Sequence, residues 1–323
     1  MSKLARFPSA ARLAELYRRQ GTPKWGPEFQ TAIRAVKEEA PPDSRPSQMF
    51  SVQCGRNLHA MSRPEADVHV ITEYRSNVIE KYDQAVIPTV RRDHVLAGAP
   101  FYSGPKLPDF EGTLAAAEEL GWLKFHPTVV VDGRLVPFPL IGDLLLFLKE
   151  PPHVWAVNLT IKASPEDFDR PFGGKRRARD PRQAAERARL RHAVEERTYD
   201  IVAIPTVRIT AQDYSANLAR NLRWLHLIRI QDAHLDLADV RRVEDAFADA
   251  VLQERAPASV IQMLGMRYNI PEAQSRIAFA RAVFERRILI DLFDEHILMD
   301  LPLRPETKHP LSGLEHWFAR RGA

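Results

Sequence analysis

A chain of 323 residues with 45% hydrophobic content is long enough for two domains and an arm. Its 46 Lys and Arg residues slightly outnumber its 42 Asp and Glu residues, which permits a nucleic-acid partner without requiring one. The single cysteine, Cys54, excludes an internal disulfide framework and a cysteine-based zinc cluster. Because no apolar stretch reaches membrane-spanning length and the N-terminus lacks the apolar block of a signal peptide, we expect a cytoplasmic protein without a membrane partner.

Residues 1–45 are expected to form an N-terminal helical arm. Helices are predicted at 10–19 and 30–39, and the stretch QGTPKWGPEF between them contains helix-breaking Gly and Pro residues. The loop APPDSRPSQ then marks a domain boundary near residue 45.

The next segment places a carboxylate at the start of a helix. MFSVQC and LHAM read as two short strands around the turn Gly55-Arg56-Asn57, and Ser62 with Pro64 begins a helix that runs to about Arg75. Glu65 lies in its first turn, where the helix dipole favours a negative charge. An acidic residue there is commonly structural, so the position alone does not assign a function.

The pattern then predicts the remaining elements of a core that spans 46–210. We expect a strand at 85–92, a surface insertion through 110, and a helix at 112–121. HPTVVV and RLVPF flank the turn Asp132-Gly133 as a hairpin, and a buried strand at 199–207 completes the sheet.

The stretch LIGDLLLFLKEPPHVWAVNLTIKAS, residues 140–164, contains two apolar runs of strand length around a Pro-containing turn. Asp143 opens the first run and Lys162 ends the second, so the two side chains are expected on adjacent strands. A carboxylate can hold a hard divalent cation, and an ammonium can orient water and offset phosphate charge. The alternative is structural: Asp143 caps a strand end and Lys162 is a solvated terminus.

A basic segment, PFGGKRRARDPR, leads into the predicted helix AAERARLRHAVEERTY. Five cations of this segment and one of the helix are candidates for contacts with a DNA backbone, which would add affinity without sequence readout. They are Lys175, Arg176, Arg177, Arg179, Arg182 and Arg187. The alternative is a solvated helix with Glu–Arg pairs, and His192 in this helix is expected at the surface.

Residues 211–323 are predicted to form a helical C-terminal domain. Helices are expected at 214–228, with Trp224 in the core stripe, and at 239–254. The segment 257–293 reads as a helix, a turn containing Gly265, a second helix and an apolar strand, ILIDLF, which together suggest a winged-helix-like unit.

Several of these elements, in this order, resemble the TnsA endonuclease family, whose members are subunits of heteromeric cut-and-paste transposases. The resemblance lies in RRQGTPKWGPEF, MFSVQCGRNLHAMSRPE, HPTVVVDGR, the Asp143 strand and the Lys162 strand, and it covers roughly residues 15 to 230. It implies an α/β fold with a restriction-endonuclease-like core and a mixed sheet, in a bacterial protein associated with the nucleoid when active.

The resemblance also implies a site and its partners. Glu65, Asp143 and Lys162 would be catalytic, and Mg²⁺, with Mn²⁺ as a substitute, would bind Glu65, Asp143 and the backbone carbonyl of Ile161. The substrate would be double-stranded DNA at transposon ends, cut in one strand at each end. An integrase-like transposase subunit would join the strands, and an AAA-type ATPase regulator would contact the C-terminal region.

Two positions depart from the family pattern. Gly142 precedes the aspartate, and Thr160 stands two residues before the lysine, where such nucleases usually carry Glu, Asp or Gln. A hydroxyl is a poor substitute for a carboxylate as a ligand of magnesium. Two alternatives therefore remain: a weak or inactive adaptor subunit that keeps the nuclease fold, and a free-standing restriction or repair nuclease.

Overall fold

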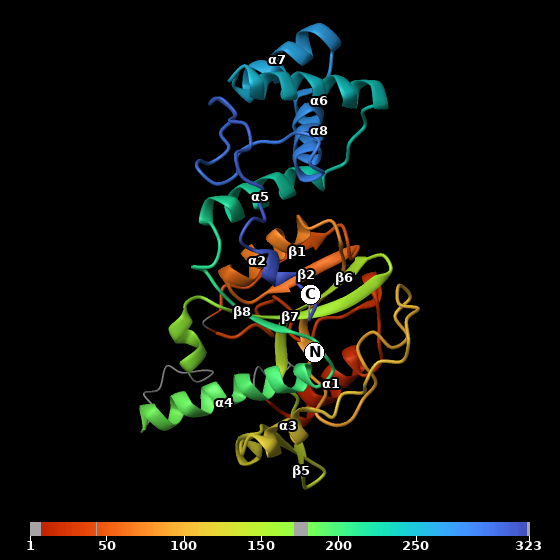
Figure 1. Cartoon of the computed structure of the whole chain (residues 1–323), viewed down its shortest axis with the longest axis vertical. Coiled ribbons are helices and arrows are strands. Elements are labelled where there is room, and N and C mark those ends of the chain that lie inside the picture. Colours follow the sequence, from red (N-terminus) through yellow and green to blue (C-terminus); the bar gives the residue numbers. More distant parts are fainter. Residues whose placement is uncertain (1–7, 43, 171–179, 322–323) are drawn as a thin grey trace. The chain divides into compact units, whose positions relative to one another are not determined.

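The computed structural model describes residues 8–42, 44–170 and 180–321. Contacts divide the chain into two compact units, one built from residues 1–69, 76–213 and 315–323, and the other from 70–75 and 214–314. The first is an α/β unit and the second is helical (Figure 1). Within the described ranges, no helix is both long and apolar enough to cross a membrane.

The N-terminal arm has one α-helix where two were predicted. Helix α1, Ala10–Gln20, is confirmed, whereas 30–39 forms turns, and a short 3-10 helix, η1, spans Gly26–Glu28. The arm is held by buried ion pairs, in which Arg12 and Arg19 of α1 lie 3.2 and 2.7 Å from the carboxylate of Glu39. Both guanidinium groups also donate to the carbonyl of Ala32. These bonds hold residues 30–39 against α1 in turns, so this segment does not form the predicted second helix.

A mixed four-stranded sheet forms the centre of the α/β unit, in the order β3-β6-β7-β8. Strands β3 (Val78–Val86), β6 (Ile141–Glu150) and β7 (His153–Lys162) are antiparallel neighbours, and β8 (Thr206–Thr210) runs parallel to β7. The predicted β6–β7 hairpin is confirmed. The strand predicted at 85–92 was wrong because β3 ends at Val86, and 199–207 is mostly the end of a helix and a loop before β8.

Two smaller hairpins flank this sheet. β1 (Ser47–Ser51) pairs with β2 (Arg56–Ala60), and β4 (Thr128–Val131) pairs with β5 (Arg134–Pro137). The second hairpin has its turn where it was predicted, whereas the turn of the first spans 52–55, so that Arg56 and Asn57 of the predicted turn belong to β2. Asp132 and Gly133 adopt positive φ in the second turn, the conformation that a tight hairpin turn requires. Helix α2, Arg63–Glu73, follows β2 and carries Glu65 in its first turn.

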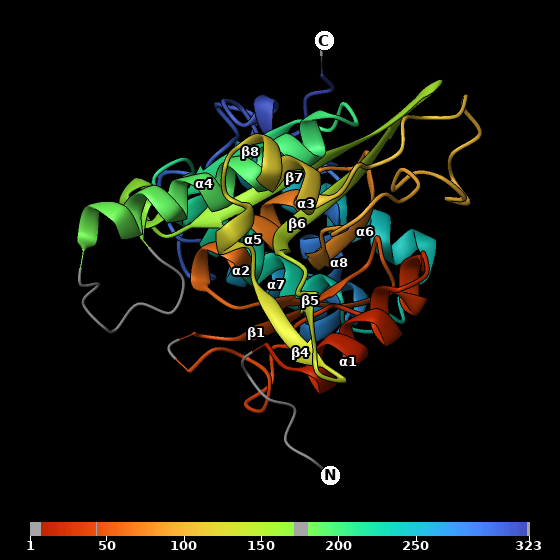
Figure 2. The ribbon, with the colours of Figure 1, turned by 90° about the horizontal axis from the view of Figure 1, so that it is seen from below.

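Helices α3 (Thr113–Glu119) and α4 (Pro181–Asp200) lie together on one side of the sheet, as Figure 2 shows. Their apolar side chains share a core with Leu145 and Phe147 of β6 and Ala156 of β7. Two further 3-10 helices lie in this unit: η2 (Leu123–Phe125) and η3 (Pro165–Asp169). Because α4 packs along this face, its inner residues lie over β7.

The second unit contains four α-helices: α5 (Ala216–Arg229), α6 (Leu237–Leu252), α7 (Pro257–Tyr268) and α8 (Glu272–Phe284). The turn predicted at Gly265 lies instead at Asn269, which is left-handed at the end of α7. The strand predicted at ILIDLF was wrong, since Ile290 forms only an isolated bridge with Pro305. The winged-helix-like organisation therefore stays a prediction.

Helix α8 forms the core of this unit. From Ile277 to Phe284 every residue except Arg281 is buried, and the ring of Phe279 stacks on Phe247 of α6 at 4.4 Å. A helix that enters a DNA groove needs an exposed face of several side chains. The burial of α8 leaves little such face along its C-terminal half.

The last described residues return to the first unit. A 3-10 helix, η4, spans Glu315–Trp317, and the indole N–H of Trp155 on β7 donates to the carbonyl of Phe318 at 3.0 Å. Arg321 forms an ion pair with Asp200 at the end of α4 at 2.7 Å. The chain end thus fastens β7 to the end of α4.

Candidate functional site

Asp143 and Lys162 meet at the ends of β6 and β7. The strands pair from Leu144 and Leu159 onward, and just outside this ladder Asp143 Oδ2 accepts from the backbone N–H of Ile161 at 2.7 Å and from Lys162 Nζ at 3.0 Å. Each side chain is about one-sixth exposed, at 16 and 17%. The structure therefore brings together the pair that the sequence placed on adjacent strands, within reach of solvent.

The backbone carbonyl of Ile161 points into the same place. Lys162 Nζ donates to this oxygen at 3.0 Å while it also donates to Asp143 Oδ2. The ammonium group therefore lies between two of the oxygens predicted to bind a metal. Carbonyl and carboxylate oxygens that already hold one cation form a suitable donor set for a hard divalent cation.

Glu65 is buried beside this pair. Its Oε2 accepts from the N–H of Met61 at 2.9 Å and from Gln84 Nε2 at 3.0 Å, while Oε1 accepts from the hydroxyl of Ser62 at 2.8 Å. Burial, together with the charge of Asp143, raises the pKa of Glu65 to about 7, while the hydrogen bonds from Met61 and Ser62 and the charge of Lys162 oppose this rise. Such mutual influence means that the three predicted residues form one electrostatic group.

Two other glutamates near Glu65 in the sequence have structural partners. Glu73 forms an ion pair with Arg229 at 3.0 Å. Glu80 accepts a short hydrogen bond from the N–H of Gly26 and lies 3.8 Å from Arg56. These contacts give Glu73 and Glu80 structural roles, whereas the pKa of Glu65 responds to the charge of Asp143.

Helix α4 brings a carboxylate that the sequence-based prediction missed. Glu195 Oε1 accepts from the hydroxyl of Thr160 at 3.0 Å and from Asn158 Nδ2 at 3.1 Å, and Arg191 lies 3.5 Å from its other oxygen. Glu195 is 1% exposed. Burial raises its pKa, Arg191 lowers it, and the charge of Asp143 raises it again. The helical spacing of buried residues at 188, 192, 195 and 199 was the signal that could have found it.

His192 is buried, whereas the sequence predicted it at the surface. Its ring packs edge-on against Phe168 of η3 at 5.2 Å. Burial, with the nearby charges of Arg191 and Lys162, lowers its pKa to about 3, so the imidazole is neutral at physiological pH. The sequence prediction failed because His192 belongs to the inner face of α4 rather than to its charged outer face.

The six predicted DNA-backbone residues are only partly described. Lys175, Arg176, Arg177 and Arg179 lie outside the described residues. Arg182 and Arg187 are exposed on the first turns of α4. Arg187 lies over the ring of Phe125 at 4.2 Å and donates to Gln183 Oε1 at 2.8 Å. Both remain accessible to a ligand at this end of the helix.

A ready three-residue metal centre is absent from the described residues, since no three His, Cys, Asp or Glu side chains form a group that could hold an ion. Asp143 and the carbonyl of Ile161 supply two oxygens at the place now taken by the Lys162 ammonium. Magnesium typically binds through one or two carboxylates and keeps several waters, and this site meets that requirement.

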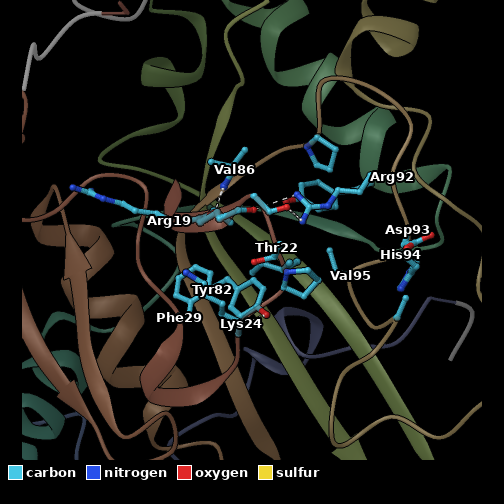
Figure 3. A pocket seen from close by; sticks show the side chains of 18 residues that line it. Arg19, Thr22, Lys24, Phe29, Tyr82, Val86, Arg92, Asp93, His94 and Val95 are labelled. Carbon is cyan, nitrogen blue, oxygen red and sulfur yellow. Dashed lines mark hydrogen bonds between the residues drawn. The ribbon is translucent and has the colours of Figure 1, made fainter. Parts of the chain in front are cut away.

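A separate cavity of about 300 Å³ lies between the N-terminal arm, the C-terminal half of β3 and the loop that follows β3. Figure 3 shows Arg19, Lys24 and Phe29 of the arm around it, with Tyr82 of β3 stacked beside Phe29 and with Arg92 from the loop after β3. None of the predicted catalytic residues lines it. The candidate site is therefore the partly exposed open end of the β6–β7 hairpin, at Asp143 and Lys162, rather than this cavity.

No protein-family model and no curated protein matches this chain.

Proposed function

We propose that this chain is a metal-dependent DNA endonuclease with a restriction-endonuclease-like core, and that it serves as a subunit of a heteromeric transposase. The observation that carries the proposal is the convergence of Asp143, Lys162 and buried Glu65 at one accessible sheet end. The resemblance of the sequence to the TnsA endonuclease family supports the choice of DNA and of transposon ends as substrate.

The mechanism follows from what each side chain can do. Glu65 and Asp143 would hold magnesium together with the Ile161 carbonyl, and the bound ion would polarise the scissile phosphate and offset its developing charge. Lys162, released from Asp143, would orient the attacking water for in-line attack at phosphorus and contribute positive charge beside the phosphate. Asp143, through its bond to the N–H of Ile161, keeps the ends of β6 and β7 in register during this step.

Basic residues on α4 would place the DNA. Arg182 and Arg187 are exposed, and their guanidinium groups can contact phosphates without reading bases. We propose that the joining of strands and the recognition of transposon ends belong to a separate integrase-like subunit, and that the helical unit receives an AAA-type ATPase regulator.

The proposal is tested by nicking of labelled transposon-end DNA in Mg²⁺ or Mn²⁺, with and without the partner subunits. Asp143→Asn and Lys162→Met are expected to lower the rate at least about a hundredfold. Asp169→Asn is the matched control, since this carboxylate pairs with Arg189 on the exposed surface. No metal-dependent nicking by the wild type, even with all partners present, would contradict the proposal.

One observation favours a second function, a non-catalytic adaptor with a nuclease fold. Thr160 occupies the position at which an acidic ligand is expected. An adaptor would bind DNA and partner subunits with the same affinity after Asp143→Asn and would not nick in any combination. Cutting of arbitrary duplexes without partners would instead indicate a free-standing nuclease.

A further inference from the structure

Thr160 and Lys162 share one face of β7, because side chains two residues apart in a strand point to the same side. A glutamate at position 160 would therefore direct its carboxylate into the space over this face. That space already contains a carboxylate, since Glu195 of α4 accepts the hydroxyl hydrogen of Thr160 at 3.0 Å. The strand supplies a hydroxyl here, and the helix above it supplies the acid.

A neighbour of Glu195 carries a buried hydrogen-bond acceptor that has no donor within the described part of the chain. Asn158 is fully buried, and its Oδ1 has no hydrogen-bond partner among the described residues, although its Nδ2 donates to Glu195 and to Thr206. A buried acceptor without a donor costs free energy. Water molecules of a hydrated divalent cation would be donors to this oxygen and to Glu195.

Both oxygens lie close to Gly142, the residue before Asp143. A Cβ atom at this glycine would be 3.6 Å from Asn158 Oδ1 and 3.7 Å from Glu195 Oε1. These are ordinary van der Waals distances, so a small side chain at this position would contact both acceptors. The influence of Asp143 on Glu195 agrees with this closeness.

We propose that Glu195 replaces the missing acidic residue of the site: Thr160 positions it, and with Asn158 it accepts hydrogen bonds from the waters of the bound divalent cation. This inference rests on the proposed function, because it assigns a residue to the same metal site. It makes Glu195 a positioning residue that acts through metal-bound water.

The inference explains why position 160 is not acidic. A glutamate there would place a second negative charge within contact of the buried Glu195. Like charges so close cannot both stay ionised without a large cost. A glutamate at 160 is therefore compatible with a neutral residue at 195, and threonine is compatible with Glu195.

Mn²⁺ binding to the purified full chain, measured by calorimetry without DNA, tests this. Glu195→Gln is expected to raise the dissociation constant for Mn²⁺ by about tenfold or more. This range is typical of residues that form hydrogen bonds to the ligands of a metal rather than to the metal itself. Glu196→Gln is the matched control, because the next residue on α4 instead pairs with Arg208 on the exposed surface. Its affinity should equal that of the wild type.

The exchange of positions is the more demanding test. In Thr160→Glu/Glu195→Gln the acid returns to the strand, and Mn²⁺ affinity is expected to recover to within about threefold of the wild type, whereas Thr160→Glu alone should not bind more tightly than the wild type. Thermal unfolding without metal checks the fold. A cooperative unfolding transition of Glu195→Gln shows that the variant is folded, although it loses the ion pair with Arg191.

The outcomes separate the two proposals. No Mn²⁺ binding by the wild type would overturn the metal site as a whole, and with it this inference. Unchanged affinity in folded Glu195→Gln, while Asp143→Asn abolishes binding, would overturn only the role of Glu195. If Glu195→Gln does not fold, Thr160→Val takes its place: it removes only the hydroxyl, and unchanged affinity there would also overturn the inference.

Discussion

The raised pKa of the buried Glu65 leads to a prediction about stability that does not depend on catalysis. Its pKa is about 7 in the folded chain, against an ordinary value of 4.5. Between these values the folded state holds the proton more tightly than the unfolded state does, so the free energy of unfolding falls as pH rises through this window. The shift of 2.5 pKa units corresponds to about 3 kcal/mol lost between pH 4.5 and pH 8.

The measurement is urea unfolding in a chelating buffer across this pH range, for wild type and for Glu65→Gln. The amide keeps an acceptor for Met61 and Gln84 and can donate to Ser62, so only the titration is removed. Buried His192, with its lowered pKa, gives the opposite trend at acidic pH, but it titrates in both proteins and cancels in the difference. A difference that stays constant within about 0.5 kcal/mol from pH 5 to 8 would refute the reasoning.

The same titration governs metal affinity, since a bound cation requires the ionised carboxylate. About nine-tenths of Glu65 is ionised at pH 8 and about one-tenth at pH 6, so Mn²⁺ should bind about tenfold more weakly at the lower pH. The calorimetric dissociation constant measures this change. A pH-independent constant would show that Glu65 takes no part in binding.

Two further predictions concern stability. Arg19→Met leaves the buried Glu39 without its main partner and should lower the free energy of unfolding in urea by about 3–5 kcal/mol. Arg18→Met, at an exposed ion pair, should lower it by less than about 1 kcal/mol. Equal effects of the two substitutions would contradict the role of the buried pair. Asn221→Ala removes hydrogen bonds to backbone groups of residues 292, 295 and 297. It should lower the free energy of unfolding by about 2–3 kcal/mol and speed amide hydrogen exchange in 291–304. Unchanged exchange in this segment would show that another contact holds it.

The sequence was sufficient for Asp143 and Lys162 because their placement depends on local signals. Two apolar runs of strand length around a Pro-containing turn define one hairpin, and adjacent strands bring the two ends together whatever the rest of the chain does. The start of α2 was equally local, since Ser62 and Pro64 lie within three residues of Glu65. The signals that begin α2 and pair β6 with β7 are short-range, whereas the meeting of Glu65 with Asp143 depends on the packing of α2 and was predicted only from the family resemblance.

The edge strand β3 was placed wrongly because its stabilisation is long-range. Its sequence VIEKYDQAV contains Glu80, Lys81 and Asp83, all buried, and charges at such spacing normally indicate a solvated segment. Arg56 of β2 makes this burial tolerable, since it donates to Asp83 at 2.6 Å and also bonds the carbonyl of Lys81. A pattern within one strand cannot reveal a partner that comes from another hairpin.

Glu195 shows the same limit at the candidate site. The prediction counted carboxylates by their spacing from Lys162, and at that spacing it found only Thr160. What a cation requires is oxygen atoms and negative charge at a place in space, and a helix that packs over the strand can supply both. The acid is 33 residues beyond Lys162, so a fixed spacing rule cannot find it.

Helix α4 therefore joins two parts of the proposed activity. Exposed Arg187 and buried Glu195 lie about two turns apart on one rigid element. A DNA backbone that contacts the first turns would fix the helix against β7, and this holds the Glu195 carboxylate against the hydroxyl of Thr160. The contact of DNA with the first turns of α4 would thus order the Glu195 carboxylate. DNA should therefore raise the affinity for Mn²⁺ in the wild type, and should raise it less in Glu195→Gln. Equal enhancement by DNA in both proteins would show that α4 binds DNA independently of the site.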